Sequence, residues 1–160
     1  MAKEIKNTCT WPYSSRQIAE IAKAEKYPVA GDGEFFPDGG SRKRMKWHLD
    51  LVQSSMPINM RYHVSGSTES QYAHNAALLL DNQRIRGIDH CDIERRKMYK
   101  TRIPKGWHEN VIDPSLAVED PDHNRHIPLP DFSPIDLHDF HNKCCKHWNI
   151  RRDREEVTLW

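Results

Sequence analysis

Two stretches near the middle of the chain alternate apolar and polar residues, and this alternation restricts the available folds more than any other feature. In residues 46–52, Trp47, Leu49 and Leu51 alternate with polar neighbours, and residues 58–64 repeat the pattern. Side chains of a β-strand point alternately to its two faces. Each stretch therefore predicts a strand with one buried side and one side that faces solvent.

A second pair of strands is predicted directly afterwards. Residues 76–80 form a compact apolar run, Asp81 and Asn82 are turn-forming residues, and residues 84–89 again alternate. Such a pattern is typical of a β-hairpin. Four strands with short connections favour antiparallel pairing, because parallel strands need crossovers of a dozen residues or more. We expect a short antiparallel sheet of about four strands.

Helical spacing appears at both ends of this segment. Near the N-terminus, Ser14 and Ser15 precede Ile18, Ile21 and Ala22, which recur at the spacing of one helix face. Near the C-terminus, Ser133 and Pro134 resemble an N-cap and a first-turn proline. The apolar stripe that follows consists of Leu137, Phe140, Cys144 and Trp148. The expected fold is α+β, with an N-terminal and a C-terminal helix packed on the sheet.

The length of 160 residues fits one domain with its own core. The segment from Asp113 onwards is rich in aspartate and proline, which favours an irregular acidic connection. We expect a single domain over 1–160, with four parts: 1–45 as N-terminal helix and loop, 46–112 as sheet, 113–133 as irregular acidic arm, and 134–150 as C-terminal helix.

Composition excludes several classes of protein. No apolar run approaches the roughly 20 residues of a membrane-spanning helix, and the first ten residues lack the apolar stretch of a secretory signal. Cys9, Cys91, Cys144 and Cys145 lack the regular spacing of a disulfide framework and contain no CxxC pair. We expect reduced thiols, a cytoplasmic protein and no membrane partner.

The net charge of +1 conceals a strongly basic segment. Cations neutralise phosphates and rings stack on bases, a mixture suited to single-stranded nucleic acid. The candidate nucleic-acid-binding residues are Arg95, Arg96, Lys97, Tyr99, Lys100, Arg102, Lys105 and Trp107. An edge strand kept basic against aggregation is the alternative. The acidic stretch of residues 113–139, which includes Glu119, Asp120 and Asp122, is predicted to fold back along the edge of the sheet and cover part of this basic surface.

Histidine is abundant, with ten in the chain, and five residues form a candidate catalytic group: Arg61, His63, Asp89, His90 and His108. Histidine transfers protons near neutral pH. If the strand ends converge, His63 and His108 would act as acid and base in RNA cleavage, Arg61 would stabilise charge, and Asp89 would orient an imidazole. Ordinary surface histidines are the alternative.

Metal binding is the rival chemistry. His138, His141 and Cys145 share roughly one face of the C-terminal helix, although no HExxH motif is present. Helical histidines more often serve packing or capping. We therefore expect neither a metal nor another cofactor.

The segment 84–90, the following Lys105, Gly106, Trp107 and His108, and the C-terminal helix resemble, in their order, small bacterial toxins of the TumE type over about residues 58–150. This resemblance implies a bacterial or phage origin and an antitoxin protein as partner. It draws attention to Asp89, His90 and His108.

These observations predict a nucleic-acid-directed protein, with RNA favoured over DNA, in the form of a metal-independent endoribonuclease of toxin type. The alternative is a module that binds nucleic acid or protein without chemistry. The sequence leaves both open.

Overall fold

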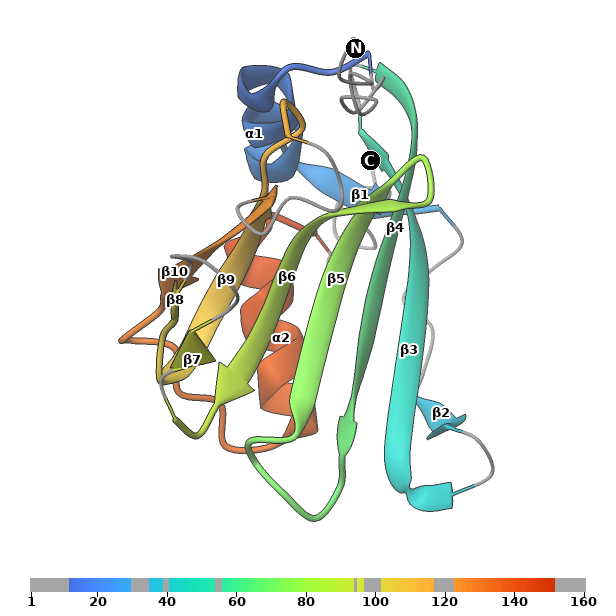
Figure 1. Cartoon of the computed structure of the whole chain (residues 1–160). Coiled ribbons are helices and arrows are strands. Elements are labelled where there is room, and N and C mark those ends of the chain that lie inside the picture. The colour runs from blue at the N-terminus through green and yellow to red at the C-terminus, as the bar shows by residue number, and fades with distance from the viewer. Residues whose placement is uncertain are drawn as a thin grey trace, which may run out of the picture.

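The structure is a computed structural model that describes residues 12–29, 35–38, 41–53, 56–93, 95–96, 102–116 and 123–151 (Figure 1). Its helices are α1 (Ser15–Lys23) and α2 (Leu137–His147). Its strands are β1 (Lys26–Pro28), β2 (Phe36–Asp38), β3 (Ser41–Gln53), β4 (Met56–Ser67), β5 (His74–Leu80), β6 (Gln83–Cys91), β7 (Arg95–Arg96), β8 (Arg102–Ile103), β9 (Gly106–Ile112) and β10 (Asn124–Pro128).

One antiparallel sheet dominates the fold, in the order β1-β3-β4-β5-β6-β9-β10, with β2 pairing the same edge of β3 as β1. Strands β7 and β8 form a separate two-stranded sheet. The expected α+β class is confirmed, but within the described residues the main sheet has eight strands and not about four. Most neighbours in the sheet are also neighbours in sequence, as in a meander.

The strands that the sequence did not predict lack clear alternation. In β9, Trp107, His108, Asn110 and Ile112 are all buried, so both of its faces are covered and polar residues lie inside. Strand β10 falls within the stretch expected to be irregular, and pairs with β9 from Asn124 to Pro128. Its proline is the last residue of an edge strand, where a missing backbone donor is tolerated.

The hairpin predicted around Asp81 and Asn82 is present. Both residues have positive φ, 49° and 64°, and Asn and Asp are the non-glycine residues that most readily adopt this conformation. Two consecutive residues with positive φ match the turn type whose twist suits a two-residue hairpin. The turn fixes the register of β5 against β6, with Leu80 opposite Gln83.

Both helices have side-chain caps. The Ser14 hydroxyl accepts a hydrogen bond from Gln17 N, and the Gln17 side chain accepts one from Ser14 N, which forms a capping box. Helix α2 begins three residues later than Ser133 and Pro134 suggested, because Asp136 is its N-cap and accepts from Asp139 N at 2.7 Å.

The core lies between the sheet and the helices. Helix α2 contacts β4 and β5 and lies behind the strands in the view of Figure 1. Its buried residues Phe140, Cys144 and Cys145 join the inward-facing strand residues and the buried face of α1 in one apolar cluster. No helix of the described residues is long and apolar enough to cross a membrane.

The outward positions of the strands form what we call the open face: the side of the sheet opposite α2. On β3 and β4 it carries His48, Asp50, Arg61 and His63, which lie between the buried residues of the core. Neither helix of the described chain covers these residues. The open face is therefore where polar side chains of several strands meet.

Candidate functional site

One line of residues crosses the open face perpendicular to the strands. Each residue of this line is the register partner of the next residue on the neighbouring strand, from β3 to β10. The line consists of His48, His63, Ala77, Gly87, Asn110 and His126. The imidazoles of His48 and His63 lie at the β3 end of the line. The amide of Asn110 and the imidazole of His126 lie at the β10 end. The two small residues between them leave the centre of the face without long side chains.

At the β3 side, three rings follow one another, and we call Phe36, His48 and His63 the ring row. The His48 and His63 rings stack with centroids 4.4 Å apart and planes tilted by 21°. The Phe36 ring lies 5.8 Å from His48. Phe36 is 41% exposed and His48 is also exposed. Stacked, accessible rings on a sheet are a surface on which unpaired bases stack.

Cations flank the ring row. Lys46 Nζ lies 5.4 Å from the centroid of the Phe36 ring, within the range of a cation–π contact. Arg61, two residues before His63 on the same face, donates to Asp50 Oδ1 at 3.0 Å. Arg44 is exposed one repeat further along β3. The rings therefore stand among positive charges that favour a phosphate backbone nearby.

At the opposite side, a chain of polar contacts ends at Asp89. His126 Nδ1 lies 2.5 Å from Asn110 Oδ1. Because that oxygen accepts from the ring, the amide group of Asn110 is left to donate to Asp89. His108 Nε2 lies 2.5 Å from Asp89 Oδ1. His108 is 1% exposed, whereas the Asp89 side chain is 44% exposed, so only the carboxylate of this pair reaches the surface.

Asp89 is fixed as an anion. Burial raises its pKa, but the His108 hydrogen bond and charge, the Asn110 hydrogen bond and the charge of Arg84 together hold the pKa below its ordinary value. His108 Nδ1 also lies 3.2 Å from the carbonyl of Gly106. Both ring nitrogens of His108 thus face acceptors, and the imidazolium form satisfies both of them.

The structure brings Asp89 and His108 together, but it keeps His63 away from His108. These two histidines lie on β4 and β9, three strand spacings apart, which is about 14 Å. His90 points to the opposite face, where its ring packs 5.1 Å from Trp107. The expected acid–base pair is therefore not assembled, and the imidazole next to His63 is His48.

The basic segment is described in part. Arg95 and Arg96 lie in β7 and Arg102, which is exposed, in β8. Lys105 is exposed in the turn before β9. Lys97, Tyr99 and Lys100 lie outside the described residues, as do Glu119, Asp120 and Asp122 of the acidic arm.

Trp107 is not available for stacking on a base. It is 8% exposed and packs against Phe140 and Phe132, with ring centroids 5.2 and 5.5 Å away. It belongs to the core, because position 107 of β9 points toward α2.

The three residues considered for metal binding differ in burial and do not form one site. His141 and Cys145 are buried, and His141 Nδ1 lies 2.9 Å from the Tyr62 hydroxyl and 3.8 Å from Cys145 Sγ. His138 is exposed and its ring lies 5.0 Å from that of Phe35. Among the residues that the structure describes, no three His, Cys, Asp or Glu side chains are grouped so that they could hold a metal ion.

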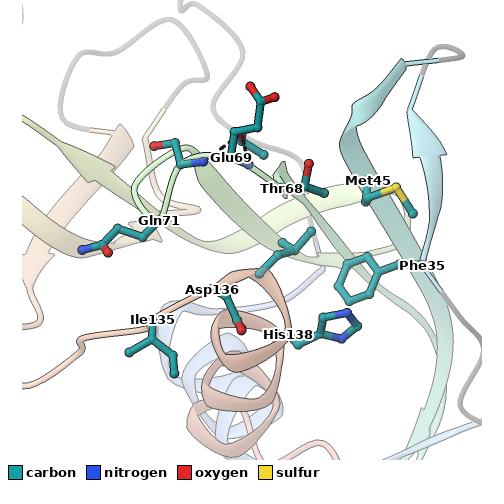
Figure 2. Close-up of a pocket in the computed structure, with 11 residues that line it drawn as sticks. Phe35, Met45, Thr68, Glu69, Gln71, Ile135, Asp136 and His138 are labelled. Carbon is teal, nitrogen blue, oxygen red and sulfur yellow. Dashed lines mark hydrogen bonds between the residues drawn. The ribbon is translucent and has the colours of Figure 1, made fainter.

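A pocket of about 480 Å³ lies on the helix side, between the start of α2, the β4–β5 connection and β3 (Figure 2). Phe35, Met45 and Leu137 give it apolar walls, and Glu69 and His138 stand at its rim. Ile135 beside it is 75% exposed.

Sequence reasoning missed two members of the ring row. His48 occupies an outward position of the alternation in residues 46–52, and pairs directly with His63. That register depends on where the β3–β4 turn falls, which alternation does not specify. Phe36 lies in a three-residue strand after a glycine-rich stretch, and carries no periodic signal.

No protein-family model, no curated protein and no solved structure matches this chain. The likeness to TumE-type toxins consequently stays a prediction from sequence.

Proposed function

We propose that this protein is nucleic-acid-directed and binds single-stranded RNA on the open face. The observation that carries the proposal is the ring row, in which Phe36, His48 and His63 stand side by side on the surface. Each base that stacks on an aromatic side chain contributes about 1–3 kcal/mol. A duplex buries its bases, so the rings favour unpaired strands.

Charge supports the same proposal. Arg44, Lys46 and Arg61 lie on the open face beside the rings, and the paired strands β7 and β8, which contain Arg95, Arg96 and Arg102, follow β6. The net charge of +1 gives little general attraction, so binding depends on this local arrangement.

Fluorescence anisotropy with an RNA oligonucleotide of about 12 residues, within the site sizes of single-strand binding domains, tests the proposal. The double variant Phe36→Ala/His63→Ala is expected to lose tenfold or more in affinity. His138→Ala removes an exposed imidazole from the helix side and serves as the matched control. Equal affinity in wild type and double variant would refute binding at the ring row.

The salt dependence gives an independent check on the cations. Arg61→Gln is expected to lower the slope of log affinity against log salt by about one, since one phosphate contact is lost. Arg16→Gln, on the exposed face of α1, is expected to leave the slope unchanged. A slope near zero in the wild type would remove nucleic acid as the ligand.

RNA cleavage is the second candidate, and the stacked pair of His48 and His63 favours it. Two imidazoles with centroids 4.4 Å apart can supply one proton acceptor and one donor, and Arg61 on the same face can stabilise charge on the phosphate. The roles assigned to His63 and Arg61 remain, and His48 takes the place of His108.

This candidate predicts cleavage in the presence of chelator, with a bell-shaped pH dependence. His48→Ala/His63→Ala is expected to abolish it. If the likeness to TumE-type toxins extends to function, expression also arrests bacterial growth, and the double variant relieves the arrest. RNA that stays intact with and without divalent metal would reduce the function to binding.

A further inference from the structure

A hollow of about 360 Å³ opens in the middle of the open face, between β5 and β6. It exists because Ala77 and Gly87, which are paired across these strands, carry little or no side chain. A Cβ atom added to Gly87 would lie 3.4 Å from Asn110 Nδ2 and 3.6 Å from Arg84 Cδ. The volume lies within the range of roughly 300–1,000 Å³ typical of small-molecule sites.

The hollow has one anionic acceptor among its lining residues, the Asp89 carboxylate. A carboxylate offers about four lone-pair sites. His108 donates to Oδ1 and Asn110 also donates to the carboxylate, and acceptor capacity remains for a ligand. Because Asp89 Oδ1 is buried while the side chain is 44% exposed, Oδ2 provides the accessible edge.

The remaining walls suit a flat ligand with a negative tail. Tyr72 is 49% exposed and is among the residues that line the hollow, which gives the hollow an aromatic side. Arg44 and Arg84 line the same hollow and are both exposed. A ligand that fits must therefore donate hydrogen bonds to a carboxylate, stack on a ring, and carry an anion.

We propose that this hollow binds a guanine nucleotide, with the Watson–Crick edge of the base on Asp89 and the phosphate beside Arg44 or Arg84. Guanine presents two adjacent donors, N1–H and N2–H, to the accessible carboxylate oxygen, which can accept from both. Adenine and cytosine each place an acceptor next to their amino group, and uracil flanks its single N–H with two carbonyls. Those acceptors are repelled by the fixed anion.

The inference deepens the proposed function, because it takes the ligand to be a nucleotide and names the base. Asp89 and His63 lie on β6 and β4, two strand spacings or about 10 Å apart. A guanine in the hollow thus belongs to the same strand of RNA as bases on the ring row.

Calorimetric titration of the intact protein with GMP, IMP, AMP and UMP tests the proposal. IMP lacks only the N2 amino group of GMP. Loss of one hydrogen bond to a charged acceptor predicts binding about tenfold weaker for IMP than for GMP, and UMP is expected to bind least. This comparison needs no variant and so does not depend on how a substitution affects folding.

Two variants locate the site. Asp89→Asn is expected to weaken GMP binding about tenfold or more and to remove the difference between GMP and IMP. Ala77→Leu fills the hollow from β5 and is expected to abolish GMP binding with Asp89 intact. Asp81→Asn, in the hairpin turn at the far end of the same strands, is the matched control and should bind as the wild type does.

Equal affinities for GMP and UMP, or unchanged GMP binding in both Asp89→Asn and Ala77→Leu, would overturn the inference. Either result is compatible with RNA binding on the ring row, which is measured separately with Phe36→Ala/His63→Ala. Conversely, selective GMP binding without detectable binding of single-stranded RNA would refute the proposed function and support the inference. The two failures are therefore distinguishable.

Discussion

The ammonium group of Lys26 donates a 2.8 Å hydrogen bond to the carbonyl of Trp148, across 122 positions of sequence. The same Nζ atom donates to the carbonyls of Ala22 and Ala24 at 2.8 and 2.7 Å. These carbonyls belong to the C-terminal ends of α1 and α2, where helix carbonyls lack partners and a cation is favoured. Lys26 thus joins the ends of both helices.

Lys26→Met is expected to destabilise the protein by about 3 kcal/mol, because it leaves three carbonyls without their donor. Burial lowers the pKa of Lys26 to about 7, with Arg86 adding to the effect. Three carbonyl acceptors nevertheless match the three hydrogens of the charged form, which a neutral amine with two cannot satisfy. Urea denaturation measures the change. Lys23→Met, at an exposed site of α1, should shift stability by less than about 0.5 kcal/mol.

We expect His74 to make the fold sensitive to acid. It is 3% exposed, with ring centroids 5.3 Å from Phe140 and 6.4 Å from Trp107. Burial lowers the pKa of His74 below 6.5, and the charge of Arg44 lowers it further. A backbone hydrogen bond to Ala73 and the charge of Asp136 raise the pKa, but they do not cancel the lowering.

Between pH 6.5 and the lower folded-state pKa, the unfolded chain binds a proton at His74 that the folded chain does not. Stability is therefore expected to fall as pH falls below about 6.5. His74→Phe should keep the packing and flatten this decline, as measured by urea denaturation at several pH values between 7 and about 5. An unaltered decline in the variant would assign the acid sensitivity to another group.

The pair of Glu109 and His147 is expected to have the opposite pH dependence. Glu109 accepts from Trp148 Nε1 at 2.7 Å, and its other oxygen lies 3.2 Å from His147 Nε2. The hydrogen bond to Glu109 raises the pKa of His147 above 6.5, against the effect of burial. This contribution to stability is complete below pH 6.5 and is lost as pH rises through the folded-state value.

Glu109→Gln is expected to cost about 2 kcal/mol near pH 6 and less at higher pH, where His147 is neutral in either protein. NMR titration of His147 should show its pKa fall in the variant. Glu20→Gln, on the exposed face of α1, is the control. A cost that does not vary with pH would mean that the Trp148 hydrogen bond alone accounts for the role of Glu109.

Alternation of residues predicted the four central strands, because β3 to β5 bury every second side chain in the core, and β6 follows β5 through the Asp81–Asn82 turn. It missed β9, where His108 and Asn110 are buried on the open-face side and break the apolar pattern. It also missed β10, which carries a proline and has five residues. Edge strands and doubly covered strands lack the one-sided burial that produces alternation.

The sequence could predict which side chains of the candidate site point outward, but not which of them lie next to one another. That His63 points outward follows from alternation, and its partner His48 follows only once the register of β3 and β4 is known. The separation of His63 from His108 depends on the order of strands in the sheet, in which β5 and β6 lie between β4 and β9. Sequence proximity carries no information on that order for residues 45 positions apart.

Photo-crosslinking of the intact protein to single-stranded RNA that contains 4-thiouridine tests whether RNA bases stack on the ring row, because mass spectrometry then identifies the residues in contact with bases. Crosslinks are expected at Phe36, His48 or His63, and should be lost in Phe36→Ala/His63→Ala. Crosslinks confined to the helix side, at His138 or elsewhere in residues 133–151, would contradict it.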